Sequence, residues 1–167
     1  NRPDSTTRYT ILTGLGIDYG DAPEDYPVLI ADSGAGHQIV DGFFLGSFVD
    51  AEPDGQPSEL ADADLGDDGT IFPPSLVAGN ELTITVSASA AGMLDAWLDK
   101  NGDGDWDDSG EQIFTSESLT PGDNELTFLL DVTTTGNTFA RLRFSSGGGL
   151  SPTGMADDGE VEDYLVN

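Results

Sequence analysis

The chain has 167 residues, with 32 Asp and Glu against 5 Lys and Arg, which gives a formal net charge of -27 at pH 7. This length suits one domain with its own core, and such an acidic surface makes nucleic acid and anionic membranes poor partners. The absence of cysteine excludes disulfides and thiolate zinc sites. Bound cations are therefore expected to offset the charge, and Ca2+ is the candidate, since about millimolar extracellular concentrations load even weak sites.

The N-terminal part is predicted to be linker and loop. Residues 1–16 are interpreted as a linker or a short edge strand, and residues 17–167 as a single domain cut from a longer secreted protein. Two prolines and a glycine within residues 18–27 indicate a loop, in which Asp18 and Asp21 are candidate metal ligands. The alternative is a tyrosine-anchored turn with solvated acids. No signal peptide or membrane-spanning run is present in the sequence, so membrane insertion is not expected.

A long acidic loop is expected between residues 50 and 70, which contain no positive charge. Loops of this length inside a compact domain usually have a function or are disordered. Alternating acids are a spacing that calcium loops use, so three further residues are candidate metal ligands: Asp62, Asp64 and Asp67. The alternative is a solvated acidic loop.

The second half of the chain is predicted to consist of strands. Apolar residues alternate with polar ones at 82–88, 94–98, 126–132 and 140–144, and a last strand is expected at 161–166. Turns are expected at 79–80, 121–124 and 136–137. This pattern predicts an all-β fold, an antiparallel β-sandwich with long calcium-binding loops and one apolar face per sheet. No segment shows a convincing helical period.

The segment 99–111 has the clearest chemical pattern. Oxygen-bearing side chains fall at every second position, at Asp99, Asn101, Asp103 and Asp105. Glycines between them permit the tight turn that a calcium loop needs. Residues 99–104 fit the opening of the EF-hand pattern, but its twelfth position is glycine, so the loop is expected to be closed by Glu111, or by Asp107 or Asp108. The alternative is an acidic turn without metal.

Residues 158–164, Asp-Gly-Glu-Val-Glu-Asp-Tyr, resemble the signature of the GEVED domain family. The resemblance extends to residues 18–23, 44–57, 96–99 and 140–145, and so spans most of the chain. It implies a secreted, calcium-dependent β-sandwich of large bacterial surface proteins. The chain is also similar to the peptide-binding domain of long repeat-in-toxin adhesins, which implies that bound calcium helps to hold peptide ends.

The last strand is a further candidate metal site. Glu160 and Glu162 are two residues apart and are expected on one face, with Val161 on the other face, toward the core. Flanking Asp158 and Asp163 complete the set of candidate metal ligands, and the loop after Asp18 could contribute because chain termini often lie close together. The alternative is a solvated edge strand whose charges discourage aggregation.

The expected function is that of a calcium-dependent peptide-binding module in an extracellular bacterial adhesin, monomeric by itself. An ion with an open coordination position could take the C-terminal carboxylate of a target protein. Arg141 and Arg143 share a strand face and, with Ser151 and Thr153 of the following Gly-rich loop, are the candidate ligand-binding residues. Alternatively, the two arginines pair with carboxylates of the protein itself.

Alternatives to peptide binding are a structural spacer, a carbohydrate-binding module and an enzyme. Calcium could make the domain a rigid structural spacer that binds nothing. Trp97, Trp106 and the tyrosines could stack on sugars in a carbohydrate-binding module. Catalysis is not expected, because the chain has no cysteine and no G-x-S-x-G motif, and His37 follows a Gly-rich turn that favours a structural role.

Overall fold

The computed structural model of the chain describes residues 16–73, 77–134 and 136–167. The linker or edge strand expected over residues 1–16 lies outside these ranges, apart from Gly16. The described elements are β1 (Ile17–Tyr19), the 3-10 helix η1 (Ile30–Asp32), β2 (Gly36–Gln38), β3 (Thr70–Ile71), β4 (Glu81–Ala88), β5 (Gly92–Leu98), β6 (Gln112–Leu119), β7 (Gly122–Leu129), β8 (Thr138–Ser145), β9 (Met155–Ala156) and β10 (Glu160–Val166). The predicted all-β fold is confirmed. In the described part of the chain, no helix is long and apolar enough to span a membrane.

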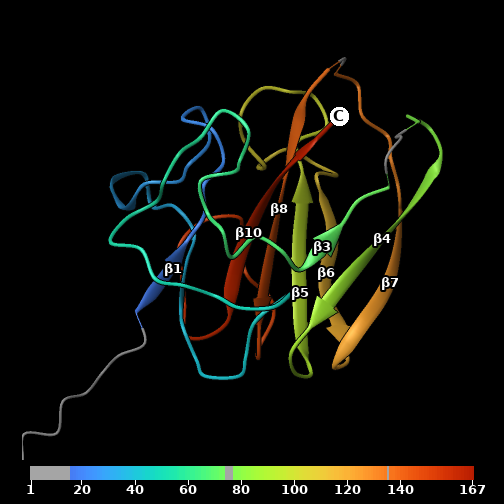
Figure 1. Cartoon of the computed structure of the whole chain (residues 1–167). Coiled ribbons are helices and arrows are strands. Elements are labelled where there is room, and N and C mark those ends of the chain that lie inside the picture. The colour runs from blue at the N-terminus through green and yellow to red at the C-terminus, as the bar shows by residue number, and fades with distance from the viewer. Residues whose placement is uncertain (1–15, 74–76, 135) are drawn as a thin grey trace, which may run out of the picture.

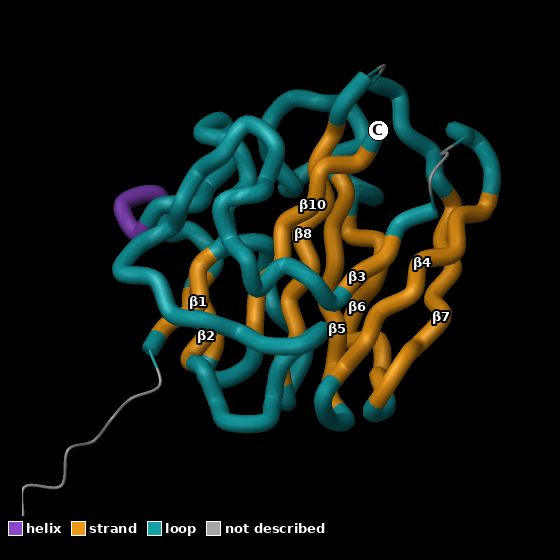
Figure 2. The backbone as a smooth tube through the Cα atoms, in the orientation of Figure 1, coloured by secondary structure: helices purple, strands orange, loops and turns teal. Residues whose placement is uncertain are grey.

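The described strands form three sheets. A four-stranded antiparallel sheet has the order β10-β8-β5-β6, and a second sheet has the order β3-β4-β7. In Figure 1 the loops of residues 16–68 lie on the left of the four-stranded sheet, and β4 and β7 lie on its right. The small third sheet, β1-β2-β9, contains one parallel pair, β2 with β9, and sits among the loops on the left of Figure 2.

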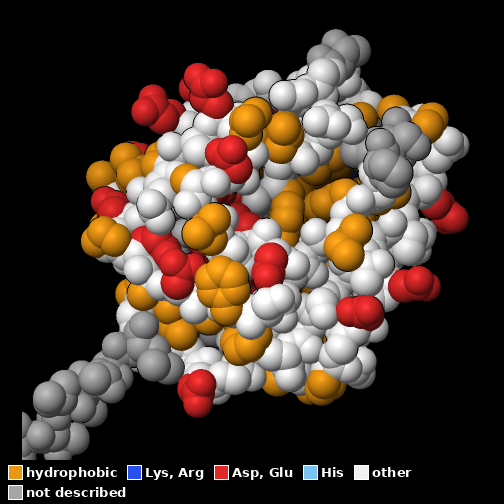
Figure 3. All heavy atoms as spheres, in the orientation of Figure 1, with side chains coloured by type: hydrophobic (Ala, Val, Ile, Leu, Met, Phe, Trp, Pro, Cys, Tyr) orange, Lys and Arg blue, Asp and Glu red, His pale blue; other side chains and the backbone are white. Residues whose placement is uncertain are grey.

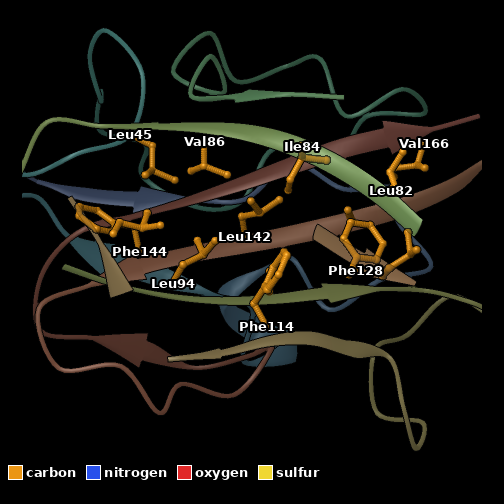
Figure 4. Packing of buried hydrophobic residues seen from close by; sticks show 14 of the residues in the cluster. Leu45, Leu82, Ile84, Val86, Leu94, Phe114, Phe128, Leu142, Phe144 and Val166 are labelled. Atoms are coloured by element: carbon orange, nitrogen blue, oxygen red, sulfur yellow. The ribbon is translucent and has the colours of Figure 1, made fainter. Parts of the chain in front are cut away.

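The main core fills the space between the two larger sheets. Ile84 and Val86 of β4 face Leu94 of β5 and Leu142 of β8, and all four are buried. Figure 4 shows these side chains pointing toward one another across the sandwich. Their alternation with polar residues along each strand places the apolar side chains on one face, and their burial is the main driving force for packing the sheets.

The four-stranded sheet has a second buried face, which the sequence did not predict. Every residue of β8 is buried. On the face away from the main core, Phe139, Trp97 and Trp106 pack against Tyr26 and other residues of the N-terminal loops. The expectation of one apolar face per sheet is therefore wrong for this sheet, because the N-terminal loops cover the face that was expected to meet water.

The longer strands follow the sequence pattern in part. The strand expected at residues 126–132 lies instead at 122–129, as β7, and the sequence does not predict the short strands β1, β2, β3 and β9. The strand β6 was not predicted, and its exposed positions follow no simple alternation. The turn expected at residues 121–124 is shorter than predicted, because β7 already begins at Gly122. Asn124 lies within β7, and its side chain accepts a hydrogen bond from the Thr120 backbone N–H at 2.9 Å, which tightens the connection between β6 and β7.

The faces of β10 are reversed from the expectation. Glu160 pairs with Phe144 and Glu162 with Leu142, whereas Val161 pairs with Arg143. Opposed residues in an antiparallel pair share a face, so the two glutamates do lie on one face, but it is the face of the main core. Both are buried, so the alternative of a solvated edge strand is also wrong here.

Candidate functional site

The segment Asp99–Glu111, called the ion loop below, connects β5 to β6. Its two ends are held together, because the Leu98 N–H donates to the Glu111 carbonyl at 2.9 Å. Gly102 and Gly104 have φ values of 77° and 92°, in the left-handed region that favours glycine. Their N–H groups donate to the two carboxylate oxygens of Asp99, at 2.5 and 3.1 Å. The loop therefore curls around the Asp99 side chain.

Three carboxylates converge in the ion loop. One oxygen each of Asp99, Asp103 and Glu111 lies within 4.8 Å of the others. Asp99 and Glu111 are buried and Asp103 is exposed, so these three residues, the loop triad, are closed on one side and open on the other. Burial raises the pKa of Glu111, and repulsion from the other two carboxylates adds to the shift. A hard cation would relieve this repulsion and could be held here.

The other candidates in this loop lie outside the triad. The Asn101 amide donates to Asp103 at 2.9 Å and to Asp108 at 2.7 Å. Asp105 accepts the backbone N–H of Asp107 at 2.9 Å. Of the three residues proposed to close the loop, the structure thus brings Glu111 to the triad.

Aromatic side chains anchor the ion loop to the sheet. The Tyr26 hydroxyl donates to Asp99 at 2.6 Å, and the Trp106 indole N–H donates to the Phe139 carbonyl at 3.1 Å. The rings of Tyr26 and Trp106 are 4.5 Å apart. Trp97 and Trp106 are only 3% and 2% exposed, so neither can stack on a sugar.

A second group of carboxylates lies where the N-terminal loops meet β10. Asp18, Glu52 and Asp64 are buried, and one oxygen of each lies within 4.8 Å of the others. Buried Glu160 borders them, because a Cβ built on Gly66 would lie 3.1 Å from Asp64 Oδ1 and 3.5 Å from Glu160 Oε1. Asp18, Glu52, Asp64 and Glu160 are called the buried carboxylate cluster below.

The cluster is electrostatically unfavourable without a counter-charge. Burial and repulsion from neighbouring carboxylates raise the pKa of Glu160 to about 11 and that of Glu52 to about 7. Burial likewise raises the pKa of Asp18, against the backbone hydrogen bond from Val161, and repulsion from the neighbouring carboxylates adds to the increase. Asp64 Oδ2 and Glu160 Oε1 are buried without a hydrogen-bond partner. Such groups favour a bound cation.

Three neighbouring acids cap backbone groups. Asp21 accepts the N–H groups of Ala63 and Asp64, and burial, then repulsion from Asp163, raises its pKa to about 7. Glu162 accepts from the Gly69 N–H at 2.7 Å and from the Thr70 hydroxyl. Asp67 accepts the Asp163 N–H at 3.0 Å. These acids surround the cluster and hold the acidic loop against β10.

Asp62, Asp158 and Asp163 have other partners. Asp62 is exposed and accepts from the Ser58 hydroxyl at 2.9 Å. Asp158 accepts the Ser146 N–H at 2.8 Å, away from Glu160 and Glu162. Asp163 forms a two-point ion pair with Arg141, with both distances 2.7 Å. The structure therefore does not bring these three candidates into either group of converging carboxylates.

The candidate ligand-binding residues do come together, but through internal contacts. Arg141 lies 4.3 Å from the centre of the Trp106 ring and also donates to the Pro152 carbonyl. Arg143 donates to the carbonyls of Ser151 and Thr153, at 2.7 and 2.9 Å. Both arginines are essentially inaccessible, so ligand contact does not fit this arrangement, and the alternative of internal pairing describes Arg141.

His37 and Gly159 have structural roles in this arrangement. His37 is fully buried, its Nε2 accepts from Arg143 at 2.9 Å, and burial, then the Arg143 charge, lower its pKa. Gly159, within the 158–164 motif, has a φ of 95°, and an added Cβ would overlap the carbonyl oxygen of Phe144. The glycine of the motif is therefore required by a close backbone approach.

Glu52 is the residue that pattern analysis missed as a candidate ligand. It lies among several acids between residues 50 and 70, and nothing in its local spacing separates it from the exposed ones. Its buried place depends on the Tyr19 N–H, which donates to it at 3.1 Å. A contact between residues 33 positions apart leaves no local signal in the sequence.

Comparison with known proteins supports the resemblance inferred from residues 158–164. Residues 93–167, which include the ion loop and β10, match the family model of the GEVED domain. No curated protein and no solved structure matches the chain. The match runs from the second residue of β5 through β10 and leaves Asp18, Glu52 and Asp64 outside it.

Proposed function

Because residues 93–167 match the family model of the GEVED domain, and because the ion loop gathers three carboxylates, we propose that the protein is a calcium-dependent peptide-binding module. It belongs to a large extracellular adhesin on a bacterial cell surface. The ion loop holds Ca2+, and the ion takes the C-terminal carboxylate of a peptide or protein on a neighbouring cell. The module acts as a monomer, without catalysis, nucleic acid or insertion into a membrane.

The observation that carries this proposal is the asymmetry of the loop triad. Asp99 and Glu111 close one side of the site, whereas Asp103 is exposed. Calcium takes six to eight oxygen ligands, and three carboxylates with nearby backbone groups leave positions on the open side. A peptide carboxylate has the charge and the oxygen atoms to fill them.

The charge of the protein explains why the ion is needed. Acidic side chains are scattered over the face shown in Figure 3, and the net charge is -27. Such a surface repels an anionic peptide end unless a divalent ion reverses the local potential. The cationic side chains in the described ranges, Lys100, Arg141 and Arg143, are engaged with Asp131, Asp163 and His37.

A direct test compares one peptide with a free and an amidated C-terminus. We expect calcium-dependent binding of the free form and at least a tenfold loss on amidation, since amidation removes the charge that meets the ion. The variant Asp103→Asn should weaken binding, because it removes one charge from the triad.

Asp107→Asn is the matched control. It removes the same charge from an exposed position of the ion loop and should leave binding unchanged. Equal binding of free and amidated peptides would refute carboxylate capture. Saturable calcium binding with no retained peptide from a C-terminal library would favour the structural spacer, which the buried carboxylates also support.

A further inference from the structure

The buried carboxylate cluster joins parts of the chain that are far apart in sequence. Asp18 belongs to β1, Glu52 and Asp64 to the long acidic loop, and Glu160 to β10. All four side chains are at most 8% exposed. Packing four carboxylates together in a low-dielectric environment is strongly unfavourable unless a positive charge compensates them.

Two oxygen atoms of the cluster lack any partner. Asp64 Oδ2 and Glu160 Oε1 are inaccessible and accept no hydrogen bond. Both residues are more than nine-tenths buried, so water cannot satisfy these oxygens. The other oxygen of each is used, by the N–H of Gly66 at 2.7 Å and that of Leu45 at 2.5 Å. Each side chain is thus fixed by one oxygen and offers the second, as in a metal ligand with an outer hydrogen bond.

The space next to Gly66 is surrounded by carboxylate oxygens. A Cβ placed on this glycine would lie 3.1 Å from Asp64 Oδ1, 3.4 Å from Asp50 Oδ1 and 3.5 Å from Glu160 Oε1. Asp50 is exposed, so it links this space to solvent and offers an entry path for an ion. A side chain at position 66 would therefore crowd Asp64 and the free oxygen of Glu160 from one side of the cluster.

We propose that Asp18, Glu52, Asp64 and Glu160 form a second cation site that binds one divalent ion of the Ca2+ class and has a structural role. An all-oxygen ligand set suits Ca2+ rather than Zn2+, which favours nitrogen and sulfur ligands. Mg2+ usually keeps several waters, which a site of buried side chains does not favour. This site goes beyond peptide capture and holds whether or not the ion loop binds a peptide.

The consequence of this second site is attachment of the N-terminal loops to an edge strand. Asp18 Oδ2 accepts the Val161 N–H of β10 at 2.6 Å. The Asp18 carboxylate thus holds a backbone group of the edge strand with one oxygen and leaves the other oxygen for the ion. Backbone groups on a sheet edge are open to pairing with other chains. The ion keeps β1 and the acidic loop on this edge and so covers it.

Glu52→Gln provides the test, because it removes one charge while its amide oxygen can still accept the Tyr19 N–H. Without a bound ion, the variant should melt at the same or a higher temperature than the parent, since repulsion falls. At a calcium concentration a hundredfold above the Kd of the parent, the variant should melt about 5–10 °C lower than the parent. Equilibrium dialysis should count one bound ion fewer.

Glu59→Gln is the matched control, an exposed acid of the same loop, and should change neither quantity. Gly66→Ala keeps every carboxylate and places a methyl group against Asp64 and Glu160, so it too should weaken binding of this ion and lose part of the calcium-induced rise in melting temperature. It serves as the second measurement if Glu52→Gln does not fold.

The result that overturns the second site is an unchanged ion count together with Glu52→Gln as stable as the parent in calcium. Peptide capture is scored separately with Asp103→Asn, which should lose a different ion. Failure of peptide binding with a normal response of Glu52→Gln refutes the proposed function and leaves the second site standing. Normal peptide binding, together with an unchanged ion count and unchanged stability of Glu52→Gln in calcium, refutes the second site alone.

Discussion

Acidification should stabilise the metal-free protein, opposite to the behaviour of most proteins. Asp21 and Glu162 are buried, and desolvation raises the pKa of each to about 7 in the folded state. In the unfolded chain their pKa values are about 4. A group with a raised folded pKa stabilises the fold at low pH, and this contribution is lost as the pH rises through 7.

The magnitude follows from the proton uptake. Between pH 8 and pH 5 each group binds nearly one proton in the folded state only. This proton uptake raises the free energy of unfolding by at most about 2.5 kcal/mol for each group. Neighbouring carboxylates titrate together and share these protons, so we expect a combined gain of about 2–4 kcal/mol. The gain should level off near pH 4, where the unfolded chain also becomes protonated.

Urea unfolding of calcium-free protein in EDTA, followed by the fluorescence of buried Trp97 and Trp106, measures this free energy at each pH. The variant Glu162→Gln should lose about half of the gain, whereas Asp123→Asn, on the exposed part of β7, should keep it. In saturating calcium the trend should reverse, because protons compete with the bound ions for the carboxylates of the loop triad and of the buried carboxylate cluster. A free energy of unfolding that is constant or falls from pH 8 to pH 5 in EDTA would refute the reasoning.

Four further predictions concern single contacts. Gly159→Ala should cost more than about 3 kcal/mol by urea unfolding, whereas Gly122→Ala, with nearly the same φ and open space around it, should cost about 1 kcal/mol. Arg141→Met should cost about 3–5 kcal/mol because it leaves a buried carboxylate unpaired. Lys100→Met, which breaks a pair with an exposed acid, should cost less than about 1 kcal/mol, and equal costs for the two changes would contradict this view. Tyr26→Phe should weaken calcium binding to the ion loop roughly tenfold, measured by calorimetry, because a ligand carboxylate loses its outer hydrogen bond; unchanged affinity would show that this bond plays no part.

Local features of the structure could be predicted from the sequence. The alternation at 82–88 and 140–144 identified β4 and β8 because strand side chains alternate between faces. The loop triad could be anticipated because Asp99, Asp103 and Glu111 lie within one short segment whose glycines permit only a tight turn. In both cases the informative pattern lies within one short segment of the chain, so spacing alone carries the information.

The tertiary structure decided what lies far apart in sequence. Glu52 joins Asp18 and Glu160 only because the N-terminal loops pack on the four-stranded sheet, and no local pattern marks one acid in a loop of many. The same packing buries Arg141 with Asp163. Burial, hydrogen bonding and like charge set the role of an ionisable side chain, and all three depend on neighbours that only the folded chain supplies.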